Sequence, residues 1–154
     1  MPEMVCLRPA TVEDVSVLYA LDQRCFRPGI AYSPQEFISI LGSRRCISIV
    51  AEDAYGRVTG LWVLEVYHRY RTAHVLTVEV APELRRSGLG RLLMAHLEQA
   101  ALALGLPRVE LEVAEDDPIA RSFYLQLGYR VTGRVHRYYM GKIDAIRMEK
   151  MLTA

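Results

Sequence analysis

The sequence predicts that a strand ends and a helix begins within the stretch Val80-Ala81-Pro82-Glu83-Leu84-Arg85-Arg86-Ser87-Gly88-Leu89-Gly90-Arg91. Pro82 ends the apolar run before it, because proline cannot donate to a sheet ladder. The first amides of the following helix lack partners within the helix and carry the positive end of its dipole. Positive charge around this point comes from three arginines, Arg85, Arg86 and Arg91. Because Gly88 and Gly90 also allow a close approach of the backbone, the stretch favours a pyrophosphate site at the helix start.

The same stretch has a plainer interpretation, a turn that needs glycine only for its geometry. Two other phosphate-binding motifs do not match it. A dinucleotide-binding fingerprint needs a third glycine where Leu93 stands, and a Walker loop needs a Gly-Lys-Ser/Thr sequence that the chain lacks.

Hydrophobic periodicity and turn signals predict the elements on both sides of this stretch. We expect helices over about 11–24, 33–42, 89–104 and 117–128. We expect strands over about 4–7, 46–52, 58–66, 73–80, 108–113, 129–138 and 143–152. Hairpins followed by strand-helix-strand units predict an α/β fold, with a mixed, mostly antiparallel sheet of about seven strands flanked by about four helices.

Composition limits the possible partners. The 154 residues are 51% hydrophobic and 24% charged, which is typical of one soluble domain, here residues 1–154. The net charge of +1 argues against non-specific nucleic-acid binding. No apolar run approaches the ~20 residues of a membrane span, and the N-terminus lacks a secretory signal. Three widely spaced cysteines (Cys6, Cys25 and Cys46) form no disulfide or zinc pattern, so we expect a cytoplasmic protein without nucleic-acid or membrane partners.

Several motifs resemble one protein family. The pattern Pro82-x-x-Arg85-x-x-Gly88-x-Gly90 is similar to the coenzyme A loop of the GCN5-related N-acetyltransferases (GNAT). Downstream segments resemble the branch that acetylates protein N-termini, with the ribosomal-protein alanine N-acetyltransferases as its nearest members. These segments are Leu111-Glu112-Val113, Asp117-Pro118-Ile119-Ala120, Phe123-Tyr124, Leu127-Gly128-Tyr129, Tyr138-Tyr139 and Asp144-Ala145. The resemblance extends over about residues 7–152.

The resemblance implies a GNAT fold, acetyl-CoA as co-substrate and no metal. It implies direct transfer of the acetyl group to the N-terminal α-amine of a protein or peptide, for example a ribosomal protein. The implied cofactor-binding residues are Val78, Glu79, Val80, Arg85, Arg86, Ser87, Gly88, Leu89, Gly90, Arg91 and Asp117.

Glu112 is the general base that the resemblance implies. Strand alternation places Glu112 on the face opposite Leu111 and Val113. A carboxylate partly shielded on a sheet face is expected to have a raised pKa, which suits a base. The plainer alternative is a solvated strand face, and Glu79, acting through water from within an apolar run, is the fallback base.

Tyr124 is the implied acid, which protonates the departing coenzyme A thiolate. A free phenol has a pKa near 10, so it stays protonated and can donate. Tyr124 lies seven residues after Asp117, so both fall on one helix stripe. Core packing is the alternative role of Tyr124. Asp117 stands where relatives usually carry asparagine, and it keeps the role of a helix cap.

Tyr32, Tyr138 and Tyr139 are the expected walls of the acceptor site, because aromatic rings offer flat apolar area and a hydroxyl. The last turn is also basic, with Arg134, His136, Arg137 and Lys142. If functional, these charges favour acidic residues just after the acceptor N-terminus; otherwise they form a solvated edge.

Two other functions stay open at this point. A small-molecule or lysine-side-chain acetyltransferase would share the cofactor loop and differ at the acceptor pocket. A non-enzymatic acyl-CoA-binding regulator would keep the loop but lack a working base, and Glu112 with Tyr124 argues against it. The four histidines show no metal-ligand spacing, and His96 is interpreted as a packing residue.

Overall fold

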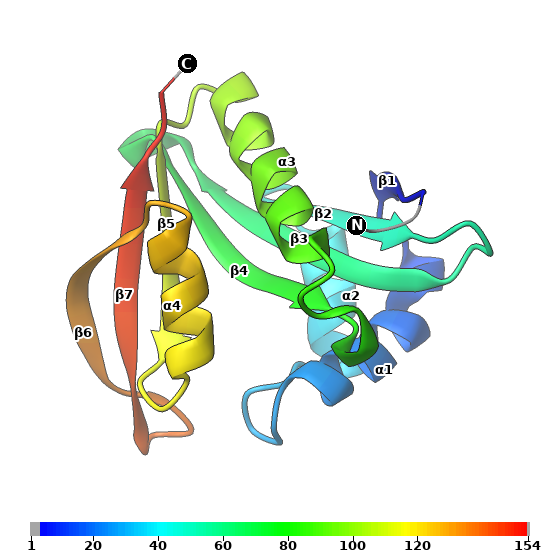
Figure 1. Cartoon of the computed structure of the whole chain (residues 1–154), viewed down its shortest axis with the longest axis horizontal. Helices are drawn as coiled ribbons and strands as arrows, with labels where there is room; N and C mark the ends of the chain where they lie inside the picture. Colours follow the sequence, from blue (N-terminus) through cyan, green and yellow to red (C-terminus); the bar gives the residue numbers. More distant parts are fainter. Residues whose placement is uncertain (1–3, 154) are drawn as a thin grey trace.

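The computed structural model describes residues 4–153, so residues 1–3 and 154 of the expected domain lie outside it. The helices are α1 Val15–Cys25, α2 Pro34–Gly42, α3 Leu89–Ala103 and α4 Pro118–Gln126. The strands are β1 Cys6–Pro9, β2 Cys46–Glu52, β3 Val58–Tyr67, β4 Thr72–Val80, β5 Arg108–Ala114, β6 Arg130–Tyr139 and β7 Ile143–Met151. Short 3-10 turns span Val12–Asp14, His68–Tyr70 and Pro82–Leu84. The predicted α/β fold is confirmed (Figure 1).

The seven strands form one sheet in the order β1-β2-β3-β4-β5-β7-β6. Neighbouring strands are antiparallel except β4 and β5, which run parallel. The β4–β5 pairing covers only three residue pairs, from Thr72 opposite Arg108 to His74 opposite Glu110. Beyond these pairs the two strands separate, as Figure 1 shows. The sheet is therefore open in its middle.

A bulge lies on β4 close to this opening. Leu64 of β3 pairs with Val75, whereas the preceding Val63 pairs with Thr77. Leu76 is thus an extra residue without a partner on β3. A bulge of this kind bends the strand and leaves backbone groups out of the ladder.

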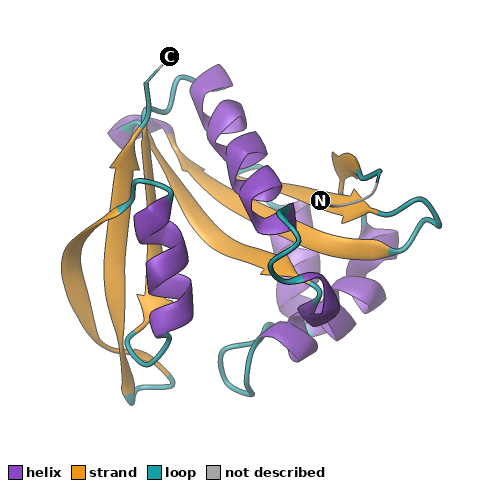
Figure 2. Ribbon diagram, viewed as in Figure 1, coloured by secondary structure: helices purple, strands orange, loops and turns teal. Residues whose placement is uncertain are grey.

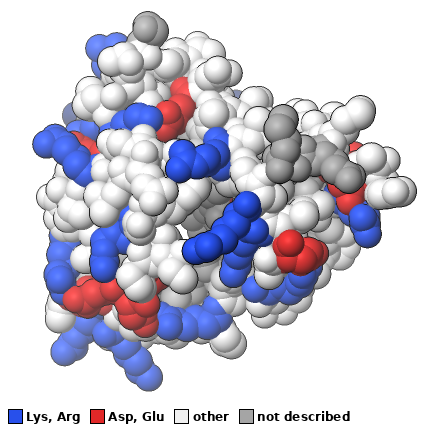
Figure 3. Space-filling view, in the orientation of Figure 1, with Lys and Arg blue, Asp and Glu red and all other residues white. Residues whose placement is uncertain are grey.

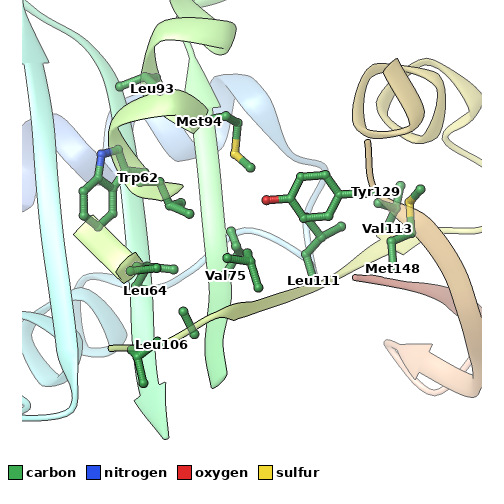
Figure 4. Packing of buried hydrophobic residues seen from close by; sticks show 14 of the residues in the cluster. Trp62, Leu64, Val75, Leu93, Met94, Leu106, Leu111, Val113, Tyr129 and Met148 are labelled. Atoms are coloured by element: carbon green, nitrogen blue, oxygen red, sulfur yellow. The ribbon is translucent and has the colours of Figure 1, made fainter. Parts of the chain in front are cut away.

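Helices cover both faces of the sheet (Figure 2). The larger apolar cluster includes residues of α3 and the partly buried side chains of α4, and Figure 4 shows its packing around Leu93, Leu111 and Met148. The smaller cluster lies on the α1–α2 side and includes Leu18 and Phe37. The central strands β3 and β4 contribute to both clusters, so their side chains alternate between two buried environments.

Local sequence signals explain several element boundaries. Ser33 caps α2 in a capping box with Glu36, at 3.1 and 3.0 Å, and Pro34 occupies the first helical position. His96 accepts a hydrogen bond from the Trp62 indole at 3.1 Å, which agrees with its predicted packing role. No helix within residues 4–153 is long and apolar enough to cross a membrane.

Candidate active site

A cavity of about 460 Å³ occupies the space where β4 and β5 separate. It is lined from β4, β5, α4, the α1–α2 loop and the end of β6. The cavity brings together both predicted catalytic residues and all three predicted acceptor tyrosines. Its lining includes Tyr32, Glu112, Asp117, Tyr124, Tyr138 and Tyr139. These residues come from distant parts of the sequence and meet because the sheet opens here.

Glu112 has three hydrogen-bonding neighbours in the cavity wall. Its side chain is only 5% exposed, and its Oε1 lies 2.6 Å from Nε2 of His74. Arg147 on β7 donates from Nε to Oε2 at 3.2 Å, and the Tyr138 hydroxyl donates to Oε1 at 3.4 Å. The carboxylate is therefore fixed in position by groups from three strands.

The expected rise in the pKa of Glu112 is wrong. Burial does raise the pKa of this carboxyl, but the hydrogen bonds and charges of His74 and Arg147 outweigh it. The pKa of Glu112 is therefore below its ordinary value. Strand alternation indicated a shielded carboxyl correctly, but it gave no information about the two cationic partners.

His74 is a site residue that the sequence analysis missed. It lies on β4, is mostly buried, and is paired with Glu110 at the last paired position of β4 and β5. Its side chain contacts Glu112, two residues further along β5. Burial lowers the pKa of His74, but the neighbouring Glu112 outweighs burial, so the pKa is raised above its usual value. A polar residue inside the apolar run 73–80 was the only available signal.

His74, Glu112 and Tyr138 also line a second cavity, of about 340 Å³. This cavity includes Glu110 and Arg147 and extends towards the exposed turn at Tyr70. On this side, Nδ1 of His74 lies 3.9 Å from Oε1 of Glu65. The Glu112–His74 pair therefore separates an inner cavity from an outer one, and a proton on His74 has a route outward.

Tyr124 and Asp117 enter the inner cavity from α4. Burial, with the nearby charge of Asp117, raises the pKa of Tyr124, so its hydroxyl stays protonated at neutral pH. Its ring packs edge-on against Phe123 and Tyr129. Asp117 caps α4 by accepting from the amide of Ala120 at 3.0 Å. Tyr124 therefore both packs in the core and lines the cavity. Asp117 both caps α4 and lines the cavity.

The segment before α3 has the geometry of an open helix start. Arg86 and Gly88 have φ of 63° and 94°, in the left-handed region, and Gly88 occupies the N-cap position without a side-chain cap. Lys and Arg side chains surround a hollow on this face (Figure 3). The Leu89 amide donates to the Ser87 hydroxyl at 3.3 Å, and the next amides of the first turn, those of Gly90 and Arg91, lie beside arginines, an arrangement that fits the phosphates of a coenzyme A molecule. Val78 lines the inner cavity, whereas residues 85–91 lie outside its lining.

Gly90 also has a role in helix packing that the motif did not indicate. It is the second residue of α3, and a Cβ at this position would lie 3.3 Å from the ring of Phe123 on α4. The missing side chain therefore allows α3 and α4 to pack closely. Substitution of Gly90 would disturb this packing as well as any ligand at the helix start.

Glu79, the fallback base, has its side chain away from this cavity. It is 1% exposed, and its partners are Thr77 and Asp22, so it faces α1. Burial and the neighbouring Asp22 raise the pKa of Glu79 well above its ordinary value. Its burial on the side of β4 away from the cavity argues against Glu79 as the base.

The acceptor tyrosines belong to two segments that meet over the cavity. Tyr138 and Tyr139 pack edge-on with ring centroids 4.9 Å apart. Tyr32 donates from its hydroxyl to the carbonyl of Leu76, the bulged residue, at 3.3 Å. Gly29 lies so close to Met140 that a Cβ there would be 2.3 Å from the sulfur. The α1–α2 loop thus contacts the β6–β7 turn.

The basic corner is partly neutralised, which the sequence analysis did not anticipate. Arg134 pairs with Glu115 at 2.5 Å and with Asp144 at 3.2 Å. Asp144 also lies 3.0 Å from His136 and accepts from the amide of Arg137.

Within the described chain, no group of three or more His, Cys, Asp or Glu side chains is arranged to hold a metal ion.

Comparisons with known proteins agree on the kind of protein. A model of the acetyltransferase (GNAT) family matches residues 15–129. The N-terminal acetyltransferase A complex catalytic subunit NAA10 of Arabidopsis thaliana is 30% identical over 156 residues, which cover 97% of this chain and 79% of that protein. The B complex catalytic subunit NAA20 of the same plant is 36% identical over 107 residues, or 68% of this chain. The chain spans about three-fifths of the length of that protein, 62%.

The same fold occurs in solved structures. The ribosomal-protein-S18-alanine N-acetyltransferase from Escherichia coli superposes with a TM-score of 0.86. The superposition covers 98% of this chain and 96% of that chain at 24% sequence identity.

Proposed function

Because the chain belongs to the acetyltransferase (GNAT) family, we propose that it moves an acetyl group from acetyl-CoA to the N-terminal α-amine of a protein or peptide. Residues 1–154 act as one catalytic domain in this proposal. The observation that carries it is the Glu112–His74 pair, which shares a cavity wall with Tyr124 and three tyrosines. The names of the relatives support an α-amine as the acceptor.

Acetyl-CoA supplies the acetyl group as a thioester, which needs no further activation by the protein. The start of α3, with Arg85, Arg86 and Arg91, binds the phosphates in this proposal. Val78 and Asp117 line the cavity and face the reactive end. The bulge takes Leu76 out of the β3–β4 pairing next to the same space, where its carbonyl accepts from the Tyr32 hydroxyl.

Glu112 and His74 act together as the base. A protein α-ammonium has a pKa near 8, far above that of Glu112, so Glu112 alone is too weak to hold its proton. His74 has a raised pKa, and its Nε2, 2.6 Å from Oε1 of Glu112, shares the proton that Glu112 takes from the amine. Neutral His74 is the active form, and protonated His74 returns its proton to water through the outer cavity. The two groups are close enough to titrate as one coupled unit.

Tyr124 acts as the acid. Its hydroxyl stays protonated because burial raises its pKa, so it can donate to the departing sulfur. Tyr32, Tyr138 and Tyr139 surround the acceptor's first residues and leave its amine directed to Glu112. The Tyr138 hydroxyl bonds to Glu112 and links acceptor position to the base.

A panel of acceptors tests this proposal. It contains peptides with free N-termini, the same peptides with blocked N-termini and one lysine, and a polyamine. We expect acetylation of the free α-amine peptides and at least a tenfold lower kcat/KM for the other acceptors, since about 1.4 kcal/mol of differential binding suffices. Equal rates on the blocked peptide would replace the α-amine by a lysine side chain. A preference for the polyamine would indicate a small-molecule enzyme.

A further inference from the structure

Two buried carboxyl groups lie behind the inner cavity, on the other side of β4. Asp22 on α1 is 0% exposed and Glu79 on β4 is 1% exposed. Each lies close enough to the other to shift its pKa. One oxygen of each, Oδ1 of Asp22 and Oε1 of Glu79, is buried without a donor. Two carboxylates offer no donor to one another, so a proton between them is what satisfies both oxygens.

The remaining oxygens connect this pair to the acceptor site. Oδ2 of Asp22 accepts from the backbone amide of Tyr32 at 2.5 Å. Oε2 of Glu79 accepts from the Thr77 hydroxyl at 2.9 Å. Tyr32 is bound at its other end as well, because its hydroxyl donates to Leu76 on β4. Asp22 therefore holds the backbone of the residue whose ring lines the inner cavity.

We propose that Asp22 and Glu79 share one proton and together form a latch that holds Tyr32 and the α1–α2 loop (residues 26–33) against β4. In the latched state Glu79 carries the proton and donates it to Asp22, which is ionised and also accepts from the Tyr32 amide. Loss of the proton to solvent leaves two adjacent carboxylates inside the fold. Their repulsion is relieved when α1 and the loop move away from β4.

The surroundings favour the shared proton. Burial is the main reason that the pKa of Glu79 is raised, and the pKa of Asp22 is raised by burial as well. The thiol of Cys25, one turn after Asp22, donates to the Val80 carbonyl, and burial raises its pKa to about 11, so it stays neutral. The titratable or charged groups around the pair are Cys25 on α1, Tyr32 in the loop, Glu36 on α2 and Arg85 before α3.

Arg85 is the one cation in this set, and it acts on Cys25. Neither carboxyl has an arginine, lysine or histidine among the groups that shift its pKa. Asp22 and Glu79 are thus positioning residues, and they touch neither the acceptor nor acetyl-CoA. That the latched loop forms a wall for the acceptor rests on the proposed function; the latch itself does not.

The first test measures the shared proton on the protein alone. Glu79→Gln is the same size as protonated Glu79 and can donate to Asp22 without a proton from solvent. Because the raised pKa of Glu79 makes the native chain lose stability as pH rises, the melting temperature of Glu79→Gln should exceed that of the wild type. The gain should be about 2–4 °C at neutral pH and vanish in acid. Glu13→Gln on the exposed surface should show no such gain. If the difference in melting temperature between Glu79→Gln and the wild type does not depend on pH, the proposal of a shared proton is wrong.

The second test measures the latch through the Tyr32 amide, by hydrogen exchange with NMR detection. In the wild type, raising the pH until the pair ionises should lower the protection factor of this amide by about tenfold or more, the worth of a hydrogen bond to a charged group. Glu79→Gln and Asp22→Asn each keep one ionisable carboxyl, so neither shares a proton and both should hold the protection constant. Constant protection in the wild type, or a fall in both variants, would overturn the latch.

Failure of these tests can be told apart from failure of the proposed function. Stability and amide exchange are measured without any acceptor or acetyl-CoA. If the chain acetylates α-amines, the acceptor KM of the wild type should rise at alkaline pH in parallel with Tyr32 exchange, whereas the KM for acetyl-CoA should not. If the chain acetylates other amines, the stability and exchange results stay as expected and only the acceptor changes.

Discussion

Glu112 and Glu79 are both buried glutamates on central strands, yet their ionisation is opposite. Glu112 lies in the opening between β4 and β5 beside His74 and Arg147, and its pKa is lowered. Glu79 faces α1 beside Asp22, and its pKa is raised. Burial raises the pKa in both cases. The sign is decided by whether the nearest charged neighbour is a cation or another carboxyl.

This difference assigns the two residues different work. Glu112 is ionised at neutral pH, faces the cavity and can pass a proton to His74. Glu79 has a raised pKa, faces away from the cavity and lies beside Asp22. Both residues lie between apolar neighbours in the sequence, so the local sequence does not distinguish them.

Among these substitutions, Glu112→Gln is expected to have the largest effect on activity. Loss of the proton acceptor should lower kcat/KM by roughly 10²- to 10⁴-fold, because that is the usual worth of general base catalysis. Acetyl-CoA affinity, measured by calorimetry, should stay unchanged. Glu13→Gln, on the exposed surface away from the cavity, is the control and should stay near the wild-type rate. If Glu79→Gln shows the large loss and Glu112→Gln does not, the two roles are exchanged.

His74→Gln separates the two members of the base. Glutamine can still donate to Glu112 but cannot take its proton, so the rate at neutral pH should fall by about 10²-fold. The acid limb of the kcat/KM profile should move to lower pH, because the group with the raised pKa has been removed. His68→Gln, in the exposed turn before β4, is the control. An unchanged pH profile in His74→Gln contradicts a role in holding the proton.

Melting temperatures compare the two glutamates without any substrate. The lowered pKa of Glu112 gives stability that is present above its unfolded value and is lost as pH falls through the folded value. The raised pKa of Glu79 gives the reverse, with stability lost as pH rises. At neutral pH, Glu112→Gln should therefore melt lower than the wild type and Glu79→Gln higher, each by about 2–4 °C. Shifts of the same sign would contradict the opposite environments.

Arg147→Gln tests how the positive charge beside Glu112 affects the pH dependence of the rate. Without this guanidinium, the pKa values of Glu112 and His74 both rise, since a positive charge has been removed from the pair. The acid limb of kcat/KM should move to higher pH by about one unit or less, because Arg147 is partly exposed and water screens its charge. The control is Arg130→Gln, because Arg130 of β6 pairs with Glu149 of β7 away from the cavity; this variant should leave the profile unchanged.

The smallest effect is expected at the exposed basic corner. Arg137→Gln with Lys142→Gln should reduce any preference for acidic residues after the acceptor N-terminus by about two- to threefold, since exposed charges contribute little. Salt should reduce that preference in the wild type, because a Debye length of about 8 Å screens charges at physiological ionic strength. A preference that ignores salt would place the determinant inside the cavity.

Much of the fold could be predicted from the sequence because its signals are local. Ser33, Pro34 and Glu36 are each next to the backbone groups that they satisfy, so the start of α2 agrees with its motif. The alternation of Arg108 to Val113 gave the right faces of β5. Motifs also indicated Glu112, Tyr124 and the three tyrosines that line one cavity.

The rest of the site depended on contacts between distant residues. His74 becomes a neighbour of Glu112 only because β4 and β5 pair over three residues and then separate. Gly90 is needed for the packing of Phe123, which lies on another helix. Asp22 and Glu79 are 57 positions apart by number, and no local pattern links them.

The sequence by itself determined where strands and helices begin, which residues alternate, and which motifs resemble an acetyltransferase. These properties follow from neighbouring residues, whose spacing is fixed by the covalent chain. Only the tertiary structure decided which carboxyl has a lowered pKa, which has a raised pKa and which groups each one contacts. An electrostatic interaction depends on distance in space and on burial, and both are set by the packing of β4 between α1 and the opening at β5.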